Sequence, residues 1–484
     1  MAYVDIPQTI SSKELLENDC NFSSSVYKRL LMKNTNYKTL GELLETYQSG
    51  KEVGSLAYVE KSPFKFIRTK AINTNLFCLD FSTQGAIEYI KPDSYKIYFK
   101  EFMDLQKGDI LFVTGGNVGE VAFIDKDYTN LIFSSHIIKL KTLENPYYIF
   151  AMLKHNICKE QVNFSPTGAI KGLDTFKVNY LLNCKIPFPN HNKEQTINFI
   201  ETLTKSIIKK EALIRTRHKE ILNLIESELL NNQLPNTFTY TYPNIKELQI
   251  AGRLDTGIYC EEFKRIDFLI KNYKNGVFYI DKGKIKSGST PKTRFIGKEE
   301  FLKYQWITPS HCSDYGTIKE EERINFIGKP NLTQDCILLI NRGQGQDCGK
   351  GIFYSFADSK TGQHNQGMYR IFNYPKIQML FMMCFLNAEF MRRYCAYFSL
   401  GSKMRELKRE NFLQIPFPNF PQNLQEKIAK LYHNPNVKLE NLSLDNFTQS
   451  DEIFCQNAGI YELDLSIKQL KTTLNRMIDD IINE

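Results

Sequence analysis

The sequence lacks the segments that membrane-spanning or exported proteins need. Its longest uninterrupted apolar run has eight residues, from Met379 to Leu386, whereas a membrane-spanning helix needs about 18–20. The N-terminal segment carries acidic side chains and no apolar core, so we expect no signal peptide. These absences predict a cytoplasmic protein that makes no contact with a membrane.

Cysteine and histidine patterns typical of metal or disulfide scaffolds are also missing. The 11 cysteines are scattered, odd in number and never spaced as Cys-x-x-Cys. Zinc ribbons and disulfide frameworks are therefore disfavoured, and reduced thiols are expected. The seven histidines are dispersed and include no His-Glu-x-x-His, so the sequence predicts no metal site.

Motifs for catalysis are absent as well. No Pro-Pro dipeptide occurs, which excludes the Asp/Asn-Pro-Pro-aromatic turn of amino-methyltransferases, and no Gly-Lys-Ser/Thr forms a P-loop. The one Pro-Asp, at Pro92-Asp93, has no Asp/Glu-x-Lys in the following stretch, as a magnesium nuclease would require. We expect a chain that binds rather than catalyses. The alternatives from other classes are a nuclease with an unrecognised metal site and a scaffold that binds only protein.

What the chain does contain is an internal repeat. The motif Ile-Pro-Phe-Pro-Asn at 186–190 recurs 229 positions later, at 415–419. Upstream, the apolar strand motif Gly108–Phe112 corresponds to Asp335–Leu339 at nearly the same offset. Because this period is far longer than that of a solenoid, it predicts two copies of one whole domain.

Three further features follow in the same order in both copies. They are a glycine-bearing turn with a second strand, a helix-like stretch, and a polar Gly/Ser loop. In copy one and then copy two, these features occupy 114–123, 146–159 and 165–171, and 342–353, 376–394 and 399–405. The glycines of Gly343–Gly349 lead into a strand instead of the helix that a dinucleotide-binding fingerprint needs, so we interpret this segment as a hairpin turn.

Apolar residues at heptad spacing close each copy. This spacing is typical of a coiled-coil seam, with Lys210 and Arg217 interrupting the first one. We predict two helices of about 30 residues, roughly 45 Å long, that pack antiparallel as a spacer. The predicted spacer and partner-binding positions are Ile200, Ile207, Ile214 and Ile221 in the first helix and Leu463, Ile467, Leu470, Leu474, Met477 and Ile481 in the second.

The rest of each copy mixes strand and helix patterns. Short runs rich in Tyr, Phe, Ile and Val predict strands at 65–72, 86–90, 109–113, 121–124 and 137–140. The predicted fold is α+β, with two tandem domains that are each followed by a long spacer helix. The predicted boundaries are 1–192 and 234–432 for the domains, 193–233 for the central helix, and 433–484 for an insert with the last helix.

Polar and basic side chains fall on corresponding loops of both copies. Arg and Lys match phosphate and guanine, and Asn and Gln match adenine, so the set predicts a surface that reads DNA. For any one residue a solvated loop position is the alternative, and for His136 a structural strand-end role. The predicted residues are Lys65, Arg68, Lys70, Asn117, His136, Thr167 and Lys171 in copy one, and Lys292, Arg294, Arg342, Gln344, Gln346, Gln363, Asn365, Gln366, Ser402, Lys403 and Arg405 in copy two. The net charge of +8 permits such an anionic partner without demonstrating it.

This organisation resembles the specificity subunit of type I restriction-modification systems over nearly the whole chain. The resemblance rests on the strand motif at Gly108–Phe112 with its Gly-Asn-Val-Gly turn, on the twin proline motifs, and on Gly252–Tyr259, which looks like the segment that opens such a unit. Copy one has only a degraded counterpart of that segment, around Asp19–Tyr27. Two features depart from the pattern: Asn198 is polar where the helix after the proline motif is usually apolar, and about 28 residues, His433–Ile460, precede the last helix.

The resemblance implies two target recognition domains, each reading one half of a bipartite, asymmetric double-stranded DNA site. It implies host defence by DNA modification: two modification subunits would dock on the helices and supply S-adenosylmethionine and adenine N6-methylation. Restriction subunits would supply ATP-driven translocation and Mg²⁺-dependent cleavage. The chain itself would hold no cofactor. The close alternative is a related system whose partner chain combines methyltransferase and nuclease.

Overall fold

The computed structural model divides the chain into two compact units, which are described separately. Unit 1 comprises Met1–Glu211, Leu442–Asp451 and Ser466–Glu484, and unit 2 comprises Ala212–Asn441 and Glu452–Leu465. The structure describes residues 3–17, 20, 22, 27, 29–83, 85–99, 103–162, 178–291, 294–296, 304–319, 324–326, 330–359, 362–437 and 446–484. In this part of the chain, no helix combines the length and apolar character needed to cross a bilayer.

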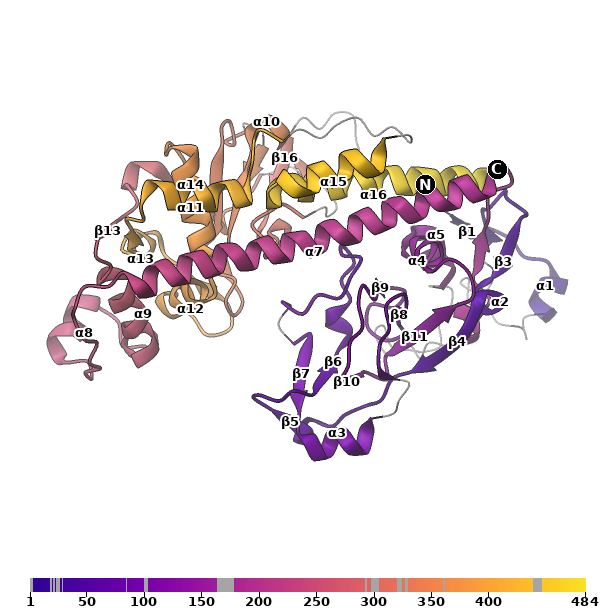
Figure 1. Cartoon of the computed structure of the whole chain (residues 1–484), viewed down its shortest axis with the longest axis horizontal. Helices are drawn as coiled ribbons and strands as arrows, with labels where there is room; N and C mark the ends of the chain where they lie inside the picture. The colour runs from indigo at the N-terminus through magenta and orange to yellow at the C-terminus, as the bar shows by residue number, and fades with distance from the viewer. Residues whose placement is uncertain are drawn as a thin grey trace. The chain divides into compact units, whose positions relative to one another are not determined.

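Unit 1 is built on two four-stranded sheets (Figure 1). The first has the order β10-β6-β7-β5, in which β10 is parallel to β6 and the other pairs are antiparallel. The second is antiparallel with the order β4-β11-β8-β9. The strands are β4 Leu44–Ser49, β5 Tyr58–Val59, β6 Lys65–Ile67, β7 Ile87–Ile90, β8 Ile110–Val113, β9 Val121–Phe123, β10 Leu131–Phe133 and β11 Ile137–Thr142.

Unit 2 repeats both sheets with the same strand order. Its first sheet is β21-β16-β17-β15, again with one parallel pair, and its second is the antiparallel β14-β22-β18-β20. The strands are β14 Ile285–Ser287, β15 Arg294–Ile296, β16 Tyr304–Ile307, β17 Ile324–Phe326, β18 Cys336–Ile340, β20 Gly351–Tyr354, β21 Gly362–His364 and β22 Met368–Ile371. This agreement of topology confirms the internal repeat that the proline motifs predicted.

Single backbone contacts repeat as well. The Ser134 N–H donates to the Ile67 carbonyl in unit 1 (2.9 Å), and the Asn365 N–H donates to the Ile307 carbonyl in unit 2 (2.8 Å). At the end of β4, a Cβ on Gly50 would lie 2.2 Å from the Phe133 carbonyl oxygen. A Cβ on Gly288, after β14, would lie 2.1 Å from the Asn365 oxygen. Both repeats therefore need glycine where two backbones approach closely.

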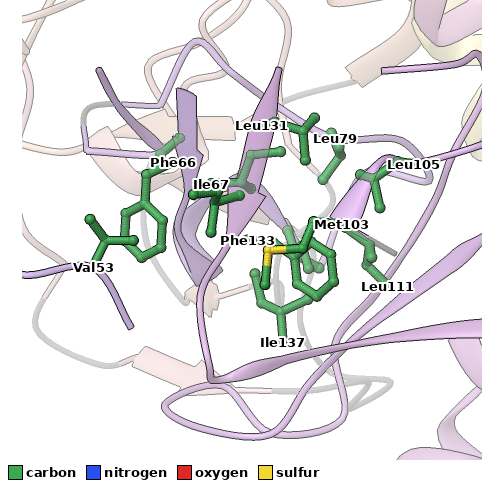
Figure 2. Close-up of a cluster of buried hydrophobic side chains, with 14 of the residues drawn as sticks. Val53, Phe66, Ile67, Leu79, Met103, Leu105, Leu111, Leu131, Phe133 and Ile137 are labelled. Atoms are coloured by element: carbon green, nitrogen blue, oxygen red, sulfur yellow. The ribbon is translucent and has the colours of Figure 1, made fainter. Parts of the chain in front are cut away.

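Strand β8 explains how the core of unit 1 forms. All four of its side chains are buried, because both faces of the second sheet are covered. Leu111 and Val113 belong to a large apolar cluster shared with the first sheet, which Figure 2 shows around Phe66, Phe133 and Ile137. On the opposite face, Phe123 of β9 packs against Phe150 in helix α4. Burying each such side chain contributes about 1.5–3 kcal/mol, so the core fixes how the two sheets pack.

The remaining elements frame the sheets. In unit 1 they are β1 Val4–Asp5, α1 Ser12–Glu17, β2 Arg29–Leu30, β3 Tyr37–Thr39, α2 Leu40–Leu43, α3 Pro92–Tyr98, α4 Pro146–Lys154, α5 Asn156–Val162, α6 Val178–Leu182 and β12 Lys185–Pro187. In unit 2 they are α8 Ile245–Ala251, α9 Glu261–Lys271, β13 Val277–Phe278, β19 Arg342–Gly343, α10 Phe356–Ser359, α11 Lys376–Leu386, α12 Glu389–Phe398, β23 Arg405–Glu406, α13 Arg409–Phe412, β24 Phe417–Pro418 and α14 Gln422–Tyr432. Each predicted helix-like stretch is two helices: His155 separates α4 from α5, and α11 ends before α12 begins at Glu389.

Two long helices contribute to both units. Helix α7, Lys193–Asn231, has 39 residues, about 58 Å at 1.5 Å per residue, and lies within the predicted bounds 193–233. Helix α16, Ile460–Asn483, runs antiparallel to it in unit 1. Asn190, just before α7, donates to Glu484 (2.6 Å), whereas Glu211 further along α7 lies 3.6 Å from Lys471. The antiparallel pairing and the α+β class are confirmed.

The predicted seam is largely buried, but it shifts along the helices. Nine of the ten predicted spacer positions are buried, and Met477 is the exception, being half-buried while its neighbour Ile478 is buried. On α7 the stripe moves from Ile221 to Ile225 and leaves Leu224 half-buried. The reason is that an α-helix has 3.6 residues per turn and drifts from a 3.5-residue repeat.

The two basic residues that interrupt the seam are both bound by helix α15, Phe447–Asn457, which forms part of the predicted insert. The fully buried side chain of Lys210 pairs with Asp451 and donates to Ser206 Oγ at 2.7 Å. Arg217 Nη2 donates to the carbonyls of Cys455 (2.7 Å) and Gln456 (3.2 Å). The insert thus supplies a carboxylate and two carbonyl acceptors to cations on α7.

Candidate nucleic-acid interface

In unit 1, the hairpin between β8 and β9 carries Asn117 at its exposed tip. Gly119 closes the turn: its N–H donates to the Val113 carbonyl (3.0 Å), and its φ of +90° is in the region that favours glycine. In unit 2, Gly349 makes the equivalent bond to Ile340 (2.9 Å) with a φ of +89°. Both units therefore present the same glycine hairpin, which agrees with the interpretation of Gly343–Gly349 as a hairpin turn.

His136 lies directly against this hairpin. Its carbonyl accepts from the Thr114 N–H (2.8 Å), and a Cβ on Gly115 would come within 2.4 Å of the His136 Nδ1. The imidazole is exposed, in the turn before β11. The structure thus brings Asn117 and His136 into one loop cluster.

The basic residues around β6 extend this cluster. Lys65 and Lys70 are exposed, and Arg68 is half-buried with its Nη1 3.2 Å from Glu88 Oε1 and its guanidinium 5.6 Å from the centre of the Tyr58 ring. The strand is joined to the His136 turn by the bond from Ser134 to Ile67. Two solvent-exposed lysines therefore flank the strand next to that turn: Lys65 begins β6, and Lys70 follows its end.

In unit 2, three loops meet around Arg342. Strand β19 pairs with β23, which places Arg342 opposite Glu406 and Gly343 opposite Arg405. The third loop joins through Asn341, whose side chain donates to the Gln366 carbonyl (3.2 Å) and whose N–H donates to Gly367 (2.9 Å). The predicted residues Gln344, Gln346, Gln366, Ser402 and Lys403 are all exposed on these loops.

Other predicted residues of unit 2 have partners within the chain. Asn365 Oδ1 accepts from the Gly367 N–H (2.6 Å), and the buried Gln363 amide donates to the Ser289 carbonyl (3.2 Å). Arg405 Nη1 donates to the Ala396 carbonyl (2.5 Å). These three side chains hold the loops together, whereas their exposed neighbours are available to a ligand.

The structure does not describe every residue of the predicted DNA-reading set. Thr167, Lys171 and Lys292 are outside the described residues. Arg294 begins strand β15, of which the backbone is described. Their role in binding stays a prediction.

Sequence reasoning missed the ion pairs beneath the glycine hairpins. In unit 1, Glu120 follows Gly119 and lies 3.0 Å from Lys159 and 3.7 Å from Lys154. In unit 2 the equivalent position is Lys350, which lies 2.5 Å from Asp314 and 3.4 Å from Asp347. The charge at this position is reversed between the units. Sequence patterns did not indicate the pairs of Glu120 with Lys154 and Lys159 or of Lys350 with Asp314, because these partners come from other segments.

Burial and neighbouring charges together shift the pKa values of Glu120 and Lys154. Desolvation lowers the pKa of Lys154 to about 7, although the Glu120 carboxylate opposes this effect. Desolvation also raises the pKa of Glu120, but Lys154 and Lys159 with their hydrogen bonds outweigh it, so the pKa lies below its ordinary value. The carboxylate is thus ionised at neutral pH and keeps its neighbouring ammonium groups in place.

The loop clusters offer cations, amides and hydroxyls, which suit phosphates and base edges. Across the described residues, no group of three or more His, Cys, Asp and Glu side chains could hold a metal ion. The fold defines a duplicated protein of mixed α and β structure that carries a polar loop cluster in each unit.

Comparison with known proteins finds a family model that matches part of the chain. The model of the type I restriction modification DNA specificity domain matches residues 32–223. This match agrees with the resemblance seen in the sequence. No curated protein matches the sequence.

Several solved structures are similar over most of their length. The S subunit of a type I restriction-modification system from M. genitalium is 15% identical, with a TM-score of 0.41 over 94% of this chain and 97% of that one. A chain from a study of complex assembly and conformational transition of the type I R-M system is 13% identical, with a TM-score of 0.29 over 93% and 98%. The HsdS subunit from Thermoanaerobacter tengcongensis is 12% identical, with a TM-score of 0.28 over 92% and 96%.

Proposed function

We propose that this chain is the DNA-reading specificity subunit of a type I restriction-modification system, and that its two units read the two halves of a split, asymmetric site. The observation that carries the proposal is that both units share one fold and one set of loops, while the side chains on those loops differ. Gly115 and His136 of unit 1 occupy the places of Arg342 and Gly367 in unit 2, as the matching backbone bonds of Thr114 and Asn341 indicate. Different side chains on one scaffold predict different half-sites.

Each loop cluster combines phosphate-binding and base-reading groups. In unit 1, Lys65 and Lys70 suit the phosphates, and Asn117 at the hairpin tip suits an adenine edge. In unit 2, Arg342 suits a guanine, with Gln344 and Gln346 beside it. The two units therefore offer different groups to the bases: an amide in unit 1, and a guanidinium with two amides in unit 2.

The chain supplies recognition, and its partners supply the chemistry. In this proposal two modification subunits bring S-adenosylmethionine and methylate adenine at N6, and restriction subunits bring ATP and Mg²⁺. The spacer helices would carry the modification subunits, and the complex would act in the cytoplasm. The sequence motifs for methyl transfer and for ATP binding are absent from this chain, in keeping with a non-catalytic role.

Methylome sequencing of a host that expresses the chain together with its modification subunit tests the proposal. We expect adenine N6-methylation at a motif of two short defined parts separated by a fixed run of undefined bases. The subunit expressed without this chain is the control and should leave that motif unmethylated. A continuous motif, or no methylation, would contradict the proposal.

Co-purification distinguishes this proposal from the alternative, in which one partner chain combines methyltransferase and nuclease. Two kinds of partner subunit favour the type I system, and one large partner favours the alternative. A scaffold without DNA affinity is a third outcome. Binding of duplex DNA that weakens steeply between about 50 and 200 mM salt would exclude it.

A further inference from the structure

In unit 1, the loop 73–78 lies between helix α7 and the glycine hairpin. On the α7 side, the carboxylate of Glu211, which is 3% exposed, accepts from the N–H groups of Phe77 (3.0 Å) and Cys78 (3.2 Å). Lys471 of α16 lies 3.6 Å from Glu211, donates to the Asn75 carbonyl and sits 5.0 Å from the centre of the Phe77 ring. Two backbone donors on one buried carboxylate bind the loop firmly to the helix.

The opposite side of this loop holds the base of the hairpin. The Thr74 hydroxyl donates to Glu120 Oε1 (3.0 Å), and the Phe77 carbonyl accepts from the Phe123 N–H (2.7 Å). Lys154 Nζ bridges the two segments, since it donates to the carbonyls of Asn73 (3.0 Å) and Val121 (3.1 Å). Glu120 and Val121 directly follow Gly119, so these bonds fix the root of the turn that presents Asn117.

Unit 2 repeats this arrangement with other side chains. The Gly316 carbonyl accepts from the Phe353 N–H (3.0 Å), as Phe77 does from Phe123 in unit 1. Asp314 lies 2.5 Å from Lys350 at the root of the second hairpin. On the α7 side, the ring of His218 meets the ring of Tyr315 edge-on with centroids 5.3 Å apart. The residues of α7 in these two contacts, Glu211 and His218, are seven positions apart.

We propose that Glu211 and His218 are positioning residues for DNA reading, each holding the glycine hairpin of its own unit through an intervening loop, 73–78 or 313–317. The inference rests on the proposed function only in taking those hairpins to contact DNA. The physical basis is a continuous chain of polar and aromatic contacts from α7 to the residue that follows the hairpin glycine. Each chain of contacts runs within one unit, so we expect a change at Glu211 or His218 to act on the hairpin of its own unit.

Hydrogen exchange on the full-length chain tests the coupling without DNA. Glu211→Gln removes the charge that binds the Phe77 and Cys78 amides. We expect exchange in 73–78 to accelerate by about ten-fold or more, as loss of a charged hydrogen bond implies, and exchange in 114–123 to accelerate with it. Glu226→Gln, at an exposed position of α7, is the matched control and should change neither. Unchanged exchange in 114–123 would overturn the inference.

The same measurement applies to unit 2. His218→Ala removes the ring against Tyr315, and we expect faster exchange in 313–317 and in 342–350. His218→Phe retains an aromatic edge and should restore the protection. If alanine leaves 342–350 protected, or if phenylalanine fails to restore protection that alanine removes, the positioning role of His218 is wrong.

Base preference measured on a library of randomised half-sites gives the functional readout. Arg342→Ala first identifies the half-site that unit 2 reads. Glu211→Gln should then weaken the base preference at the other half-site only. His218→Ala should weaken the base preference at the unit 2 half-site only. Equal relaxation of both halves, or of neither, would overturn the inference. A wild-type complex that recognises no bipartite motif would instead refute the proposed function and leave the exchange experiment to decide the coupling.

Discussion

Arg342 Nη2 lies 2.9 Å from Glu406 Oε1, across the two-stranded pair of β19 and β23. Both side chains are about half exposed, at 48% and 45%. A pair this accessible contributes little to stability, about 0–1 kcal/mol. Replacing Glu406 by a DNA group as the partner of the guanidinium would therefore cost little free energy. The guanidinium of Arg342 is therefore accessible to an anionic ligand.

Arg342→Ala should weaken recognition at one position of one half-site by about 1–3 kcal/mol, the usual discrimination of an arginine–guanine contact. Competition binding with duplexes that carry single-base changes measures this loss. Glu406→Gln is the matched control, since it removes the competing carboxylate and should leave affinity unchanged or higher. An unchanged base preference in Arg342→Ala would show that Arg342 does not read DNA.

The buried pair of Lys210 and Asp451 should be necessary for stability. Asp451→Ala removes the carboxylate beside an ammonium whose side chain is fully buried, and the expected loss is about 3 kcal/mol in the free energy of unfolding. Urea denaturation measures it. Replacing both residues by apolar ones, as in Lys210→Met with Asp451→Leu, should cost much less. Glu261→Ala breaks an exposed pair with Arg265 and serves as the control, with a change below about 0.5 kcal/mol.

The glycine at the end of β4 should tolerate no side chain. In Gly50→Ala the new methyl group would meet the Phe133 and Ser134 carbonyl oxygens at 2.2 and 2.3 Å, so the backbone must shift, at about 1–3 kcal/mol. Gly54→Ala is the control four residues away, where nothing lies within 4 Å of the added carbon. Thermal unfolding compares the two. Equal stability would mean that the close approach at Gly50 is wrong.

Stability should fall as the pH decreases from 6.5 towards 4. Burial lowers the pKa of His155 to about 4, with the nearby Asp479 opposing the shift only in part. Over this range the unfolded chain binds a proton that the folded chain excludes, so unfolding becomes easier by up to about 1.4 kcal/mol per pH unit for this histidine. Above pH 6.5 the residue is neutral in both states and has no such effect.

Urea denaturation of the wild type and of His155→Gln at pH 7 and 5.5 tests this. The difference in stability between the two pH values should be smaller in the variant, because one buried histidine no longer titrates. His191→Gln changes an exposed histidine and should leave the difference as it is. His218 and His364, whose pKa values burial also lowers to about 4, account for a remaining dependence.

Local patterns in the sequence were sufficient for much of the architecture. The repeated proline motif and strand motifs predicted two copies, and the identical sheet orders confirm them. The predicted strand at 109–113 and the helix from 193 agree with β8 and α7, because apolar period and local propensity act over a few residues. Met477 was predicted to be a buried position of the seam on α16, but the buried side chain is that of its neighbour Ile478.

Local sequence patterns did not predict which polar side chains contact each other. Lys210 and Arg217 were seen as interruptions of the seam, and nothing local indicates that α15 supplies their acceptors. The sequence analysis did not single out Glu211 or His218, yet in the fold Glu211 is buried against Phe77 and the His218 ring contacts the Tyr315 ring. Asn365 and Gln363 belonged to the predicted DNA-reading set, whereas in the fold they hold loops together.

By itself the sequence determined the duplication, the alternation of strands and helices, the glycine hairpins and the presence of two long amphipathic helices. These depend on interactions between residues close in the chain or on internal repetition. The tertiary structure alone decided which polar side chains face solvent and which are bound inside. That choice depends in many cases on contacts between segments distant in the sequence, such as Lys210 with Asp451, whose geometry is set by the packing of the core.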